Sequence, residues 1–171
     1  MSFSKLLSDL IDDGNRFLNL ARESQRKGED YLLNSYCRAV FFSSWSALEG
    51  WIKYVSMSFI DVYPDLSLYE KAFLLEKRLE INENGDILIT NSDSYKPALL
   101  KLQYIFKKFG SYDFKHEEDD LWMKLNEIQK KRNELVHPKT REKDLVINYD
   151  SAENCYKNIN KVIEIIKNKI F

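Results

Sequence analysis

The stretch KKRNELVHPK, residues 130–139, places three side chains capable of phosphate chemistry at the end of a predicted helix. They are Arg132, Asn133 and His137. Histidine titrates near neutral pH and can give or take a proton, while arginine offers a permanently charged planar fork to phosphate oxygens. Asparagine can orient the imidazole or donate a hydrogen bond to the phosphate. These groups suit the transesterification of RNA, in which a 2′-OH attacks the phosphate and no metal ion is needed.

The same three residues also suit an ordinary polar helix end. Asn133 and His137 are four residues apart and share a helix face. Because the residue before a proline disfavours helical geometry, we expect His137 to leave the helix ahead of Pro138. A cation at a helix C-terminus interacts favourably with the helix dipole, whatever its function. The spacing alone therefore leaves a structural and a catalytic interpretation open.

Glu49 is the fourth candidate, on the most apolar segment of the chain, next to Trp45 and Trp51. A carboxylate in such surroundings needs a partner. We expect Glu49 to pair with Arg132 or orient His137. The alternative is a purely structural ion pair, or a surface position on an otherwise buried helix.

Basic residues flank the motif and form a local cluster in a chain whose net charge is only -1. Such a cluster can hold an RNA backbone, or it can be a solvated helix end and loop. The candidate RNA-binding residues are Lys130, Lys131, Lys139, Arg141 and Lys143. No metal site is expected, because the acids that follow His116 suit the start of a helix, and no cofactor motif is present.

These side chains must be positioned by helices. Apolar periodicity and capping signals predict six helices. The third begins at Ser67, and the others span about residues 3–27, 30–60, 97–110, 117–136 and 151–170. The second is apolar nearly all round and carries a stripe of small residues that would let another helix approach closely, namely Ser43, Ser46, Ala47 and Gly50. Ser67 and Glu70 form a capping box for the third helix, and Asp150 with Glu153 for the last. Asn84-Gly85 predicts a type I′ β-hairpin near residues 78–90.

Length and composition place these elements in one helical domain, 1–171. Apolar residues make up 44% and charged residues 31%, as in a globular protein. The window VFFSSWSALEGWIKYVSMSFI is long enough to span a membrane, but Glu49 and Lys53 near its middle favour a buried core helix in a cytoplasmic protein. Cys37 and Cys155 are expected to be buried reduced thiols.

The chain is expected to be an all-α domain, with SALEGW in its apolar second helix and Arg132-Asn133-x3-His137 at the end of a late helix. In these features it resembles the HEPN superfamily. In that family an arginine followed four to six residues later by histidine marks metal-independent ribonucleases, and the residue after the arginine is commonly polar. An acidic residue often stands in the second helix, which Glu49 matches. The resemblance follows helix order over most of the chain, while its specific part spans six residues.

The resemblance implies a homodimer with two Arg–His pairs in one composite cleft, RNA as substrate, and a toxin–antitoxin or phage-defence setting with an antitoxin or other partner protein. Some HEPN toxins carry a tyrosine two residues after the motif histidine, which an antitoxin modifies. Here Lys139 stands at that position, so that regulation is not expected. The alternative is a non-catalytic HEPN-like module that binds a partner protein or a nucleotide.

Overall fold

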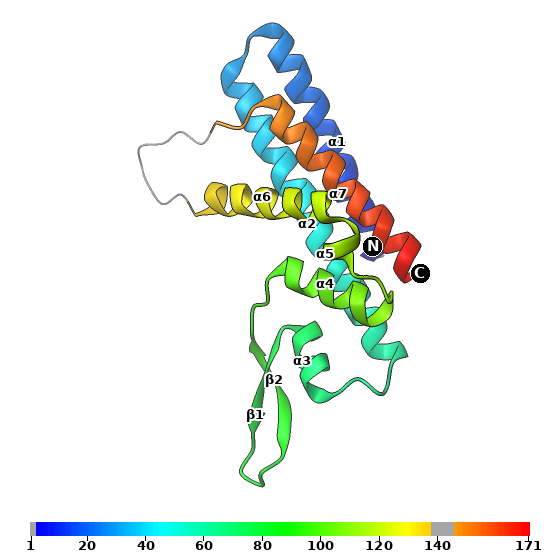
Figure 1. Cartoon of the computed structure of the whole chain (residues 1–171). Coiled ribbons are helices and arrows are strands. Elements are labelled where there is room, and N and C mark those ends of the chain that lie inside the picture. Colours follow the sequence, from blue (N-terminus) through cyan, green and yellow to red (C-terminus); the bar gives the residue numbers. More distant parts are fainter. Residues whose placement is uncertain (1–2, 138–145) are drawn as a thin grey trace.

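A computed structural model describes residues 3–137 and 146–171 of the chain. The described residues form an all-α bundle with one small antiparallel hairpin, as predicted (Figure 1). The elements in chain order are α1 (Phe3–Lys27), α2 (Asp30–Val62), α3 (Leu68–Leu75), β1 (Lys77–Ile81), β2 (Ile87–Asp93), α4 (Ala98–Phe109), α5 (Phe114–Glu117), α6 (Asp119–Val136) and α7 (Tyr149–Ile170).

The long helices α1, α2 and α7 run alongside one another, and α6 lies across α2 and α7 (Figure 1). The chain reverses between α1 and α2 at Gly28, whose φ of 70° is easily adopted by glycine. The predicted close approach to the small-residue stripe is confirmed at Gly50, where an added Cβ would overlap Leu7 Cδ2 of α1. No helix of the described residues is long and apolar enough to cross a membrane.

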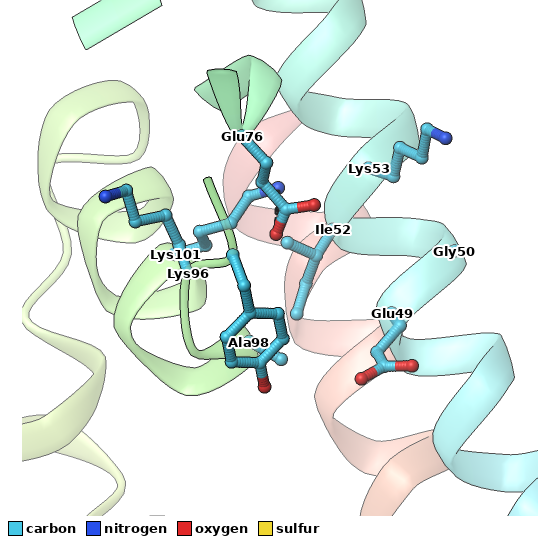
Figure 2. Close-up of a pocket in the computed structure, with 9 residues that line it drawn as sticks. Glu49, Gly50, Ile52, Lys53, Glu76, Lys96, Ala98 and Lys101 are labelled. Carbon is cyan, nitrogen blue, oxygen red and sulfur yellow. Dashed lines mark ion pairs between the residues drawn. The ribbon is translucent and has the colours of Figure 1, made fainter. Parts of the chain in front are cut away.

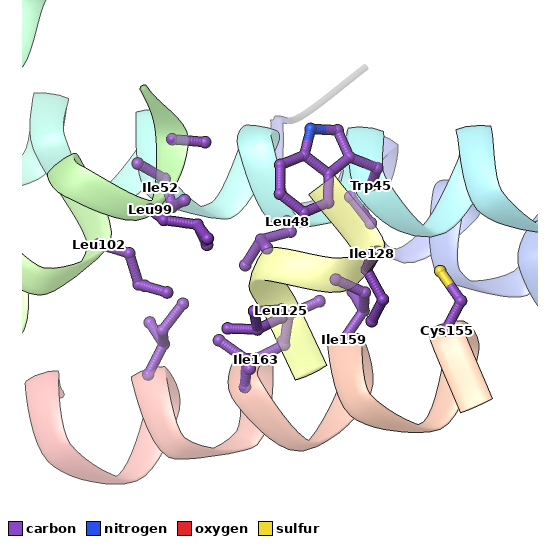
Figure 3. Close-up of a cluster of buried hydrophobic side chains, with 14 of the residues drawn as sticks. Trp45, Leu48, Ile52, Leu99, Leu102, Leu125, Ile128, Cys155, Ile159 and Ile163 are labelled. Atoms are coloured by element: carbon purple, nitrogen blue, oxygen red, sulfur yellow. The ribbon is translucent and has the colours of Figure 1, made fainter. Parts of the chain in front are cut away.

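The core lies between α2 and α7 and is filled from the side by α6 and α4 (Figure 3). Trp45, Leu48 and Ile52 come from α2 and are at most 2% exposed. Leu125 of α6 and Ile163 of α7 meet them in the cluster. Because α6 packs its apolar residues into this core, its opposite face and its C-terminal end remain at the surface.

The hairpin projects from the end of the molecule that carries α3 (Figure 1). It differs from the prediction at its turn. Type I′ needs a positive φ at both central residues, whereas only Gly85 has one, at 85°. The Asn82 side chain instead accepts hydrogen bonds from the backbone N–H of Asn84 and Asp86, at 3.0 and 2.9 Å. This stabilises a three-residue loop that ends in a left-handed glycine.

Two predicted helix starts are also corrected. The acidic stretch from residue 117 contains a break, because the short α5 ends at Glu117 and α6 begins at Asp119. The last helix is capped by Asn148, whose side chain accepts from Ser151 N at 2.9 Å, and not by Asp150. The capping box of Ser67 and Glu70 is confirmed.

Candidate functional site

The end of α6 carries the motif as the sequence predicts. His137 has left the helix, with φ −128° and ψ 69°, and its backbone N–H donates to Asn133 O at 2.9 Å. The His137 residue is exposed. Its imidazole has no hydrogen bond or ion pair within residues 3–137 and 146–171. A histidine with this freedom can reach a ligand from the helix end.

Arg132, Asn133 and His137 line one open pocket of about 730 Å³. Three of the lining residues recur on a single face of α6, because they are three and four residues apart: Asn126, Gln129 and Asn133. His137 follows them just beyond the end of the helix. The pocket is completed by Lys130, Arg132 and Glu134 of α6 and by Tyr95, from the segment before α4. The structure therefore brings the three motif residues to one solvent-open surface.

Glu49 connects this surface to the core. Its Oε1 accepts a 2.7 Å hydrogen bond from the Trp45 indole N–H, and its Oε2 lies 3.9 Å from Arg132 Nη2. Arg132 Nη1 also donates to Asn133 Oδ1 at 3.2 Å. The Arg132 side chain is 28% exposed and that of Glu49 38%, so the guanidinium is held from two sides and still faces solvent. The ion pair of Glu49 with Arg132 is therefore present, and its functional role stays a prediction.

A second pocket, of about 280 Å³, is lined by Glu49 and lies between α2, the end of α3 and the start of α4 (Figure 2). Lys101 runs from α4 towards Glu76, with 3.4 Å between Nζ and Oε1. The Lys101 side chain is 4% exposed, and its burial lowers the pKa of the amine, an effect that Glu76 opposes. No sequence pattern predicts this buried pair, because a lysine on an amphipathic helix normally faces water.

The predicted basic cluster separates into two faces. Lys130 lines the pocket of Arg132. Lys131 points to α7, where its Nζ donates to Ser151 Oγ at 3.2 Å. Both are exposed. The remaining three predicted RNA-binding residues, Lys139, Arg141 and Lys143, lie outside the described residues.

The sequence did not single out four residues of this surface. Three of them, Asn126, Gln129 and Glu134, lie on the helix that carries the motif, whereas Tyr95 comes from another segment. It lines both pockets and is 74% exposed. The only feature of the sequence that marks Tyr95 is its position two residues before Pro97, the residue that precedes α4. Nothing in the periodicity of the chain brings that segment next to α6, because their proximity depends on how α4 packs.

Comparison of the chain with family models, with curated proteins and with solved structures finds no match. The geometry of the site therefore carries the functional argument.

Proposed function

We propose that this protein is a metal-independent endoribonuclease of the HEPN type, which acts alone or in a toxin–antitoxin or phage-defence setting. One observation carries the proposal. Arg132, Asn133 and His137 line a single open pocket, and Glu49 holds the arginine in place. An arginine and a histidine at one solvent-open surface supply phosphate binding and proton transfer together.

The roles follow from the donors and acceptors of each side chain. The guanidinium of Arg132 has donors left over after its contacts with Glu49 and Asn133, and these would bind the oxygens of the scissile phosphate. His137 would transfer protons. As the 2′-oxygen bonds to phosphorus and loses its proton, the bond to the 5′-oxygen breaks and that oxygen gains a proton. The products are a 2′,3′-cyclic phosphate and a 5′-hydroxyl end.

A second chain would complete this chemistry. The reaction needs one proton removed and one delivered, and the chain holds two histidines. His116 lies in α5 and does not line the pocket. A two-fold axis near the end of α6 would bring a second Arg132 and a second His137 to the same cleft.

Cleavage of single-stranded RNA by purified protein tests the proposal. We expect His137→Ala and Arg132→Ala to lower the cleavage rate by about a hundred-fold or more. A proton-transfer group contributes about 10²–10⁴-fold, and a hydrogen-bond donor to the transition state about 10²–10³-fold. Folding should be unchanged, because both positions are partly or fully exposed. Chelation of divalent metals should leave the rate of the native protein unchanged, and DNA of the same sequence should stay intact because it lacks the 2′-OH.

Two matched controls use the same residue types away from the pocket. His116→Ala and Arg26→Ala should cleave as the native protein does, because both residues are exposed and neither lines the pocket. Equal cleavage by the native protein and both motif variants would refute the nuclease proposal, since it would assign any activity to a contaminant.

The rival function is a non-catalytic module that binds a partner protein. The hairpin favours it, because three apolar side chains lie exposed there: Ile81 at 72%, Leu88 at 49% and Ile87 at 41%. Under this alternative no preparation cleaves RNA, and Ile81→Lys or Leu88→Lys abolishes capture of the partner while His137→Ala does not.

A further inference from the structure

Tyr95 stands where the pocket of Arg132 meets the pocket against α2, and it lines both. Its side chain is 74% exposed. Within residues 3–137 and 146–171, its ring stacks on no other aromatic ring and its hydroxyl has no hydrogen-bond partner. A large aromatic surface is therefore open to a ligand at the edge of the site.

The backbone that carries Tyr95 is held on both sides. Ser94 N–H donates to Glu76 O at 2.7 Å, and Pro97 begins α4, whose first residues Ala98 and Leu99 are 7% and 3% exposed. This fixes the backbone that carries the ring, while the ring itself faces solvent. A tyrosine side chain turns about only two χ angles, so it loses little entropy when a flat ligand stacks on it.

Amide groups face the same pocket. Asn126 and Gln129 lie on the stripe of α6 that continues through Asn133 to His137. Asn126 Nδ2 donates to Trp122 O at 2.7 Å, which leaves its carbonyl oxygen available. Side-chain amides both donate and accept hydrogen bonds, as the Watson–Crick edge of a base requires. Lys130 adds a positive charge beside them.

We propose that Tyr95, Asn126 and Gln129 form a nucleobase subsite for the nucleotide next to the scissile phosphate. The base stacks on the ring of Tyr95, and the two amides hydrogen-bond its edge. A paired base cannot do this, so the substrate class is single-stranded RNA. The inference rests on the proposed ribonuclease function. It adds recognition of the base, which Arg132 and His137 do not provide.

Equilibrium binding separates this subsite from the phosphate site. The His137→Ala protein is titrated against a short fluorescein-labelled single-stranded RNA, with fluorescence anisotropy as the signal. We expect Tyr95→Leu on that background to weaken binding by about five-fold to a hundred-fold, the range for one stacked base. Tyr95→Phe should bind as tightly as Tyr95, because it keeps the ring. Tyr31→Leu is the matched control, since Tyr31 is 82% exposed at the start of α2.

A second signal reports stacking directly. RNAs with 2-aminopurine at each position in turn should show one position whose fluorescence is quenched by the protein with Tyr95 and not by Tyr95→Leu. Equal affinities of Tyr95→Leu and Tyr31→Leu, or no position that depends on Tyr95, would overturn the subsite while native cleavage persists. If the native protein neither cleaves nor binds single-stranded RNA, the proposed function fails and the subsite fails with it.

Discussion

At the scale of single residues, Glu49 is placed to orient Arg132 more than to stabilise the fold. The ion pair spans 3.9 Å, and both side chains are more than a quarter exposed, so it adds at most about 1 kcal/mol to stability. The carboxylate is itself fixed by the 2.7 Å hydrogen bond from Trp45, a residue that is 2% exposed. A buried indole thus anchors a carboxylate, which in turn limits the positions of a guanidinium at the surface.

Glu49→Gln should separate the orientation of Arg132 from the binding of the RNA phosphate. The amide oxygen still accepts from Trp45, but the negative charge beside Arg132 is lost. We expect kcat for RNA cleavage to fall by about ten-fold, because a misplaced guanidinium stabilises the transition state less well. KM should stay level or fall, since the phosphate no longer competes with a carboxylate for the arginine. Steady-state kinetics measure both constants.

Glu49→Ala supplies the contrast. It leaves the Trp45 indole N–H without its acceptor, and we expect a loss of about 1–3 kcal/mol in the free energy of unfolding, which Glu49→Gln should largely avoid. Native kcat in Glu49→Gln would show that Glu49 serves the fold alone.

The residue types and spacings predicted part of this site and missed part of it. Arg132, Asn133 and His137 were found because they lie close together in sequence. Lys130 and Lys131 were grouped together although neighbouring helix residues point about 100° apart, and the structure sends them to different faces. Tyr95 was missed because its position depends on a tertiary contact that no local pattern encodes.

At the scale of elements, α3 has eight residues and depends on one carboxylate at its start. Glu70 Oε2 accepts from Ser67 N and Oγ at 2.9 and 2.8 Å, while Oε1 accepts from Tyr104 Oη and Lys108 Nζ at 2.8 and 2.6 Å. The hydrogen bond from Lys108, followed by those from Ser67 and Tyr104, lowers the pKa of Glu70 to about 2. Glu70 therefore joins α3 to α4, the helix that follows Tyr95.

This arrangement predicts a stability effect that depends on pH. Because the pKa of Glu70 is lower in the folded state than its ordinary value of 4.5, its carboxylate stabilises the fold fully above about pH 4.5 and progressively less as pH falls towards 2. We expect Glu70→Gln to lower the free energy of unfolding by about 1 kcal/mol at pH 7, with a smaller deficit at pH 3. Urea denaturation at the two pH values measures this.

Glu83→Gln in the exposed hairpin loop is the matched control and should show no deficit at either pH. A deficit in Glu70→Gln that is equal at pH 7 and pH 3 would mean that the charge of Glu70 is irrelevant to the fold.

Local signals predicted the elements better than their ends. The capping box of α3 and the stop at Gly28 were correct because each depends on a few adjacent residues. The hairpin was correct, but its turn was not, because the Asn82 side chain satisfies two backbone N–H groups and so selects another loop. Asn148 displaced Asp150 as the cap of α7 in the same way, one residue ahead of the helix.

At the scale of the whole molecule, the proposed reaction needs more than one chain supplies. Each copy brings one Arg132 and one His137 to an open pocket at the end of α6, away from the core between α2 and α7. The net charge of -1 gives little long-range attraction for RNA, so the proposed RNA binding must come from groups gathered at the site. A two-fold pair of such pockets would double the local positive charge and supply both proton-transfer groups.

Mixing native and inactive chains tests that composite site. If the cleft needs the histidines of both chains, a heterodimer of native protein and His137→Ala is inactive. We expect an equimolar mixture of the two to fall, after subunit exchange, to about a quarter of the native rate, because only a quarter of a random mixture is native homodimer. Light scattering should give the mass of a dimer for the native, variant and mixed preparations. A mixture that keeps half of the native rate, with the variant dimeric, would place a complete and independent site in each chain.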